Sequence, residues 1–301
     1  MMNLKVWMKA FRLRTLPLAL SSAILGSFLA LAHGNFRWNV FILASLTTLF
    51  LQILSNLAND YGDTVHGVDN INRIGPMRIT QHGLVTQKQM RFMIVFFIIL
   101  SLTSGTCLIL LNLKMIGIRN ILIFFILGFS AIFAAIKYTV GKNPYGYVGL
   151  GDVFVFMYFG LIGVAGTYFL HTHNFDPWVL LPAAAIGLLS SGVLNLNNLR
   201  DIENDALSGK RTLVVRIGRK AAKIYHIALL SLSFILSVIY TLKYYGSLYQ
   251  FLFILTLPLF IMNIKVVIQN SNPIDLNNEL KKLAFSTFIF SITFGIGSVL
   301  K

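Results

Sequence analysis

The sequence is poor in charge, and this scarcity limits its fold class. Only 12% of the 301 residues are Asp, Glu, Lys or Arg, whereas a soluble domain carries about 25%. Acids are the scarcer sign, with ten in the whole chain, and hydrophobic residues make up 56% of it. The composition argues against an ordinary soluble protein and favours one that lies in a membrane.

Cysteine is almost absent as well. The single Cys107 excludes an internal disulfide, so it says nothing about the redox compartment. No linker, low-complexity tract or shift in composition interrupts the chain. We therefore expect one domain over residues 1–301.

The hydrophobic residues gather in long runs. Runs of about 18 or more predict transmembrane helices, because a helix satisfies its own backbone groups in lipid. Nine such runs predict an all-α, multi-pass integral membrane protein. They cover residues 15–33, 38–58, 92–111, 120–138, 153–170, 178–196, 224–242, 247–269 and 283–300. The basic N-terminus and first run resemble a signal peptide, but the run is long and no cleavage pattern follows it, so we expect an uncleaved first span.

The net charge of +15 could suggest a nucleic-acid partner, but the distribution of the charges argues against one. With the N-terminus in the cytoplasm, 20 of the 25 Lys and Arg fall on the cytoplasmic side and 5 on the other. Such a bias orients membrane proteins with the basic loops inside. We therefore predict a cytoplasmic N-terminus, a lipid bilayer as the surrounding medium and no nucleic-acid partner.

Six of the ten acids fall in two short stretches. The first runs over residues 56–63 and continues to Asp69, and the second covers residues 195–205. Each begins where an even-numbered run, the second or the sixth, reaches its end. Because even-numbered helices end on the same face of a membrane, both stretches can meet at one site.

The spacing of these acids indicates a metal. Asp60 and Asp63 are i, i+3, and Asp201 and Asp205 are i, i+4, so each pair shares one face of a helix. Carboxylates this close repel unless a cation lies between them, and oxygen ligands suit Mg²⁺. Zinc would need a Cys/His set, which neither stretch offers. The alternative is that the acids are solvated loop charges or partners of nearby Arg.

Polar neighbours of the acids are candidate substrate ligands. Lys210 and Arg211 could clamp a diphosphate, or could simply follow the positive-inside rule. A third stretch, residues 137–147, ends the fourth run on the same face, and its tyrosines could shield a carbocation or belong to an interfacial belt. Asp152 is either a site acid or a helix N-cap. The full set of candidates is Asn56, Asn59, Arg73, Arg78, Tyr138, Lys142, Asn197, Asn198, Lys210 and Arg211.

These motifs resemble those of the UbiA-type intramembrane prenyltransferases. The first reads Asn59-Asp60-Tyr61-Gly62-Asp63, and its third aspartate stands at Asp69, where the common spacing would place it at Gly67. That later position, residues 75–78 (Gly-Pro-Met-Arg), residues 145–152 and the run Asp201 to Thr212 are similar to the branch that prenylates 1,4-dihydroxy-2-naphthoate. Lys142 departs from that branch and is similar to other members of the superfamily.

The resemblance implies a fold and an activity. It implies nine helices around a central cavity, two Mg²⁺ ions, and transfer of a polyprenyl group from polyprenyl diphosphate to an aromatic acceptor in menaquinone biosynthesis. Diphosphate and CO₂ would leave, and demethylmenaquinol would form. The catalytic residues would be Asp60, Asp63, Asp69, Asp201 and Asp205, in a protein of the bacterial inner membrane whose site faces the cytoplasm.

Other functions stay open at this point. Within the superfamily the acceptor could be 4-hydroxybenzoate, homogentisate or haem. A secondary transporter would also carry intramembrane acids, but near the midplane at broken helices. Here the acids stand at helix ends beside dense Lys and Arg, which suits a phosphate-bearing substrate better.

Overall fold

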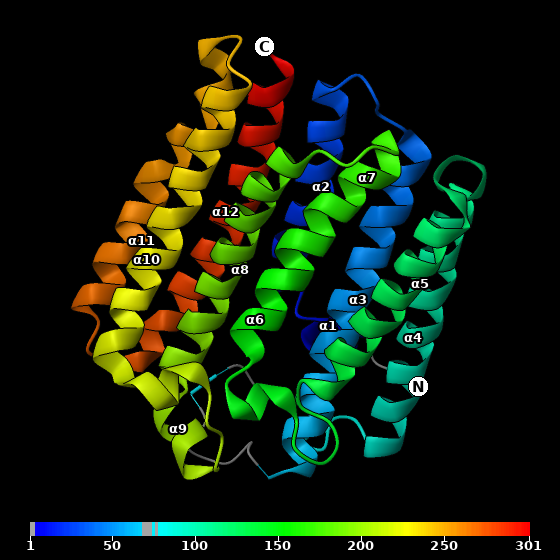
Figure 1. Ribbon diagram of the computed structural model, residues 1–301. Coiled ribbons are helices and arrows are strands. Elements are labelled where there is room, and N and C mark those ends of the chain that lie inside the picture. Colours follow the sequence, from blue (N-terminus) through cyan, green and yellow to red (C-terminus); the bar gives the residue numbers. More distant parts are fainter. Residues whose placement is uncertain (1–3, 68–73, 76–77) are drawn as a thin grey trace.

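The computed structural model is all-helical in the part of the chain that it describes, residues 4–67, 74–75 and 78–301 (Figure 1). Nine helical segments of this part are long and apolar enough to cross a membrane. They are Leu4–Ala32, Trp38–Val65, Gln87–Leu110, Leu113–Lys137, Gly151–Thr172, Pro177–Arg200, Leu213–Lys243, Leu248–Gln269 and Pro273–Val299. Each covers one of the predicted runs to within one residue, so the prediction of an all-α protein with nine candidate spans is confirmed for the described residues.

Several spans are built from more than one helical element. The first joins α1 (Leu4–Phe11), η1 (Leu13–Thr15) and α2 (Leu16–Ala32), with Arg12 in the left-handed region at φ 51°. The fifth joins α6 (Gly151–Val155), the π-helix η3 (Phe156–Ala165) and α7 (Gly166–Thr172). The other helices are α3 (Trp38–Val65), α4 (Gln87–Leu110), α5 (Leu113–Lys137), η2 (Tyr145–Val148), η4 (Pro177–Val179), α8 (Leu180–Arg200), α9 (Ile202–Leu207), α10 (Leu213–Lys243), η5 (Leu248–Thr256), α11 (Leu257–Gln269), η6 (Pro273–Asp275) and α12 (Leu276–Val299).

The main difference from the expected spans is at their ends. The run that was expected to end at residue 58 continues as α3 to Val65, and the span expected from residue 92 begins at Gln87. Hydropathy marks where apolar residues stop, but a helix goes on while its backbone hydrogen bonds continue. Residues 56–63 of the first acid stretch therefore lie on a helix and not in a loop.

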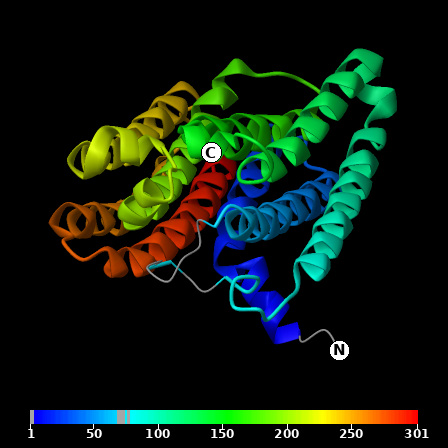
Figure 2. The same ribbon diagram turned by 90° about the horizontal axis from the view of Figure 1, so that it is seen from below.

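Helix α8 is the centre of the packing. Fifteen of its 21 residues are buried, against three of the 25 residues of α5. It packs against α10, η3 and α12, while α4 and α5 stand to one side next to α3 (Figure 2). In lipid such packing depends on close approach of small residues. A Cβ on Gly160 of η3 would lie 2.6 Å from the Ala183 carbonyl oxygen of α8, so glycine is required at this crossing.

Both acid stretches lie at the same end of the bundle. Helices α3 and α8 run in the same direction, and α9, which follows α8, lies at the lower end in Figure 1. The C-terminus lies at the opposite end. The fold thus brings together two parts of the sequence that are more than a hundred residues apart.

Candidate active site

A cavity of about 390 Å³ runs along the inner face of α3. On α3 alone its lining extends from Ala44 to Asp63, about 28 Å of helix at 1.5 Å per residue. The stretch around Leu108 and Phe124 is apolar, whereas Asp63 and Asp205 line the acid end. A cavity of this kind suits a ligand with a charged head and a long apolar part.

Three side chains donate hydrogen bonds to Asp63. Its carboxylate accepts from Arg78 Nη2 at 2.5 Å, from Lys210 Nζ at 2.9 Å and from the Tyr147 hydroxyl at 2.8 Å. Asp63 is 4% exposed, and it lines the cavity. A buried carboxylate needs such partners, because an isolated buried charge is costly.

Asp60 is placed differently from Asp63, although both lie on α3. Its carboxylate accepts from the backbone N–H groups of Ile79 at 3.2 Å and Thr80 at 3.4 Å. Asp60 is buried but does not line the cavity. In this structure its carboxylate holds the turn that carries Arg78, which in turn contacts Asp63.

The second stretch carries an ion pair between neighbours. Arg200, the last residue of α8, donates two hydrogen bonds to Asp201, from Nε to Oδ1 at 2.8 Å and from Nη2 to Oδ2 at 2.5 Å. Arg200 also donates to Asn197 at 2.9 Å and to Asn277 at 3.0 Å. Arg200 is 2% exposed and is the largest fully buried residue in the part of the chain that the structure describes. In the sequence, Arg200 is one of the 20 basic residues on the predicted cytoplasmic side, and nothing there indicates its pairing with Asp201.

Lys210 joins the two stretches. Its Nζ lies 2.9 Å from Asp63 Oδ1 and 3.8 Å from Asp205 Oδ1, and 4.6 Å from the centre of the Tyr147 ring. Carboxylates from α3 and α9 therefore share one cation. Asp201 and the amides of Asn197, Asn198 and Asn204 line the same end of the cavity.

The donor set at this end fits Mg²⁺. Its carboxylate and amide oxygens are ligands that Mg²⁺ prefers. The position between Asp63 and Asp205 already attracts a cation, the ammonium of Lys210. Within residues 4–67, 74–75 and 78–301, no group of three or more His, Cys, Asp or Glu could hold a metal ion. An ion here would therefore complete its shell with substrate oxygens and water.

Aromatic side chains form the wall next to the acids. Tyr138 and Tyr145 pack edge to face at 5.4 Å, and Tyr145 stacks on Phe154 at 4.0 Å. Burial, with Tyr145 and three nearby acids, raises the pKa of Tyr138 well above its usual value, so the phenol stays neutral. Gly146 makes this packing possible, because a Cβ there would lie 2.6 Å from the Tyr138 carbonyl oxygen.

The remaining predicted residues divide between the cavity and the surface. Asn56, Asn59, Arg78 and Tyr138 line the cavity. Lys142 and Arg211 are exposed and do not; the Lys142 carbonyl accepts from Lys137, and the Arg211 N–H donates to the Tyr147 carbonyl. Asp69 and Arg73 lie outside the described residues. Asp152 is neither the N-cap of α6, which is Leu150, nor part of the cavity lining; it accepts from the Tyr225 hydroxyl at 3.2 Å.

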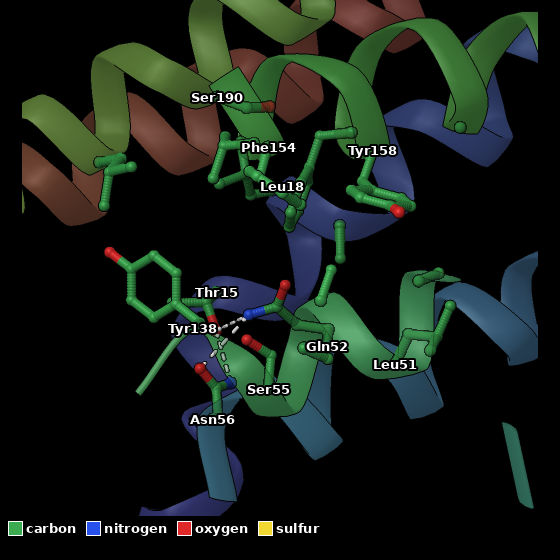
Figure 3. A pocket seen from close by; sticks show the side chains of 18 of the residues that line it. Thr15, Leu18, Leu51, Gln52, Ser55, Asn56, Tyr138, Phe154, Tyr158 and Ser190 are labelled. Atoms are coloured by element: carbon green, nitrogen blue, oxygen red, sulfur yellow. Dashed lines mark hydrogen bonds between the residues drawn. The ribbon is translucent and has the colours of Figure 1, made fainter. Parts of the chain in front are cut away.

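Other cavity residues were missed by the sequence analysis. Arg12, Thr15 and Gln52 also line the cavity, and Ser190 lies across from Gln52 (Figure 3). Gln52 stands four and eight residues before Asn56 and Asp60, so helical periodicity from the acids could have indicated it. Ser190 follows no such pattern, since its place depends on how α8 packs.

Comparison with known proteins gives the same family throughout. Residues 19–294 match the UbiA prenyltransferase family. The 1,4-dihydroxy-2-naphthoate octaprenyltransferase of Haemophilus influenzae is 41% identical over 98% of this chain and 96% of its own length. The Escherichia coli protein of the same name is also 41% identical, over 97% of this chain and 94% of its own.

Two solved structures show the same fold. A UbiA homolog from Aeropyrum pernix has a TM-score of 0.66 at 15% identity, covering 100% of this chain and 99% of that one. A UbiA homolog from Archaeoglobus fulgidus, bound to GPP and Mg²⁺, has a TM-score of 0.64 at 15% identity, covering 98% of this chain and 100% of that one. At this identity the likeness shows the fold.

Proposed function

The chain belongs to the UbiA prenyltransferase family, and we propose that it transfers a polyprenyl group from polyprenyl diphosphate to 1,4-dihydroxy-2-naphthoate, with Mg²⁺. The observation that carries this proposal is the 41% identity, over nearly the full length, to relatives named for that reaction. Their names also favour an octaprenyl donor. The products would be demethylmenaquinol, diphosphate and CO₂.

The acid end of the cavity would take the diphosphate. Asp60, Asp63, Asp201 and Asp205 are the proposed metal ligands, of which the carboxylates that share Lys210 are best placed. Bound Mg²⁺ would neutralise the diphosphate and favour its departure. Lys210, already between two carboxylates, is the residue that would turn to the phosphate oxygens. Asp69 remains a predicted member of this set.

The bond changes balance without an added proton. The allylic C–O bond breaks, and its electron pair leaves with the diphosphate. A π electron pair of the naphthoate ring forms the new C–C bond, and the ring carboxylate leaves as CO₂, returning its bond pair to the ring. The faces of Tyr138, Tyr145 and Phe154 would stabilise the allylic cation, and the apolar lining would keep water from it.

Arg78 is the better candidate for the carboxylate of the acceptor. It is 5% exposed and lines the cavity, whereas Lys142 is exposed outside it. Such a role would require that Arg78 contact both Asp63 and the substrate, which its planar, multi-donor guanidinium permits. Acceptors such as 4-hydroxybenzoate and homogentisate are the alternatives within the family.

We further propose that the nine helices form a ring around the cavity, whose acid end faces the cytoplasm of a bacterial cell. The support is the location of 20 of the 25 Lys and Arg in the loops of that side. The N-terminus would then lie on the cytoplasmic side of the inner membrane and the C-terminus on its opposite side.

Turnover with a panel of acceptors tests the proposal. Purified protein in detergent would receive octaprenyl diphosphate and, in turn, 1,4-dihydroxy-2-naphthoate, 4-hydroxybenzoate and homogentisate, each with Mg²⁺ or with EDTA. We expect product from the naphthoate alone, and none with EDTA. Turnover of 4-hydroxybenzoate but not of the naphthoate would overturn the acceptor, and full activity in EDTA would overturn the role of the metal.

A further inference from the structure

A chain of hydrogen bonds fixes the side chain of Asn56. Its Nδ2 donates to the Phe11 carbonyl oxygen at 3.0 Å and to Thr15 Oγ1 at 3.1 Å. The opposite orientation of the amide would turn Oδ1 toward that carbonyl, and two acceptors would repel each other. Asn56 Oδ1 therefore faces Gln52, and both N–H groups of Asn56 are already used within the protein.

Asn56 in turn fixes Gln52 (Figure 3). Gln52 Nε2 donates to Asn56 Oδ1 and to Thr15 Oγ1, each at 3.3 Å. A flipped amide would place Gln52 Oε1 against Asn56 Oδ1, again acceptor against acceptor. Oε1 must therefore point away from this pair. It is buried, and in the described part of the chain it has no hydrogen-bond partner.

Ser190 presents a second unsatisfied group to the same cavity. It is 1% exposed, and its Oγ also has no hydrogen-bond partner among the described residues. Serines on these helices commonly donate to the carbonyl four residues back, as Ser101 and Ser298 do. Ser190 does not, so its hydroxyl is available to a ligand that enters beside Phe154 and Tyr158.

The chemistry of these atoms selects between the two substrates. An amide oxygen needs a hydrogen-bond donor. A diphosphate presents acceptor oxygens, and a polyprenyl tail has no polar hydrogen at all. Of the two substrates, only the ring hydroxyls of the aromatic acceptor can supply the missing donor.

We propose that Gln52 Oε1 accepts a hydrogen bond from a ring hydroxyl of the aromatic acceptor, and that Ser190 Oγ contacts the same ring from the other wall. This inference rests on the proposed function, and it identifies where the acceptor binds. Asn56 and Thr15 then act as positioning residues, because they aim the amide of Gln52. Aromatic and apolar side chains, among them Tyr138 and Phe154, complete the proposed acceptor-binding site.

Inhibition by naphthoates tests the proposal without depending on ring reactivity. The inhibition constants of 2-naphthoate, 1-hydroxy-2-naphthoate and 4-hydroxy-2-naphthoate would be measured against the acceptor. In the wild type we expect at least one hydroxylated compound to bind roughly tenfold more tightly than 2-naphthoate. Gln52→Met should reduce that preference to below twofold and leave the KM for prenyl diphosphate unchanged. Gln269→Met, the same change at an exposed site on α11, should keep the preference.

Several outcomes would overturn the proposal. It fails if the wild type shows no preference for a hydroxyl, or if Gln52→Met keeps the preference, in which case the amide oxygen binds only water. Should Gln52→Met not give a cooperative melting transition in detergent, Gln52→Ala takes its place. Absence of turnover with the naphthoate in the wild type would contradict the proposed function instead, so the two failures can be told apart. Ser190→Ala should weaken the binding of the hydroxylated compounds and leave that of 2-naphthoate unchanged. Equal weakening of the binding of all three would exclude Ser190 from the hydroxyl contact.

Discussion

Replacing Arg200 with leucine should cost more stability than any surface change in this protein. The side chains of Arg200 and Asp201 are 1% and 8% exposed, and two hydrogen bonds of 2.8 and 2.5 Å join them. Arg200→Leu would leave Asp201 buried without its cation. Removal of one partner from a buried pair costs about 3–5 kcal/mol, whereas an exposed pair is worth about 0–1 kcal/mol.

A double-mutant cycle separates the lost pair from the lost packing. Asn197 and Asn277 would also lose a donor, so Arg200→Leu includes their share. In the double variant Arg200→Leu, Asp201→Leu no buried charge remains, and we expect it to be more stable than Arg200→Leu alone. Arg200→Lys keeps the charge but not the two parallel bonds, and should fall between wild type and Arg200→Leu.

The assay is unfolding of the purified protein in one detergent, at fixed protein concentration, followed by circular dichroism in denaturant. Arg219, which is 31% exposed and pairs with the exposed Glu203 at 3.1 Å, provides the control, and Arg219→Leu should change stability by less than about 1 kcal/mol. If Arg200→Leu were no worse than Arg219→Leu, the burial argument would be wrong. The same conclusion would follow if the double variant were less stable than Arg200→Leu.

Three further predictions concern the site and its orientation. Asp205→Ala should lower turnover at least a hundredfold while the protein still melts cooperatively, because one of the proposed Mg²⁺ ligands is gone; turnover within tenfold of wild type would contradict this. Lys210→Ala should raise the KM for prenyl diphosphate several-fold and leave the KM for the acceptor unchanged, whereas Lys220→Ala, at an exposed site, should match the wild type. Equal effects of the two changes would mean that Lys210 only contributes to the positive charge of the cytoplasmic side. In a cysteine-free background, Ala206→Cys should resist a membrane-impermeant thiol reagent in intact cells and Asn35→Cys should react, and the reverse pattern would invert the topology.

The nine spans could be predicted because lipid leaves a backbone few choices. An apolar run of sufficient length must be helical there, so counting runs gives the number of helices. The ends could not be read in the same way. Helix α3 passes from apolar residues into Asn59, Asp60 and Asp63 without a break, and it ends at Val65. Charge at a helix end does not stop the helix; it only shows where the lipid stops.

The residue types of the site could be predicted from the sequence, but their arrangement in space could not. Spacing placed Asp60 and Asp63 together, yet one carboxylate binds the backbone of residues 79 and 80 while the other lines the cavity. Lys142 and Lys210 were both basic neighbours of the acids, and only the path of the chain after α9 brings Lys210 between the carboxylates. Such choices depend on contacts between residues that are distant in the sequence, which periodicity does not contain.

The chemistry proposed for this cavity predicts a fixed ratio between its products. The direct measurement uses purified protein, Mg²⁺, octaprenyl diphosphate and 1,4-dihydroxy-2-naphthoate labelled in its carboxylate, with released CO₂ and prenylated ring counted in the same reaction. We expect one CO₂ for each prenylated ring, and neither product from the protein carrying both Asp63→Ala and Asp205→Ala. Prenylated product that retains the labelled carboxylate, or equal product from the doubly substituted protein, would contradict the account.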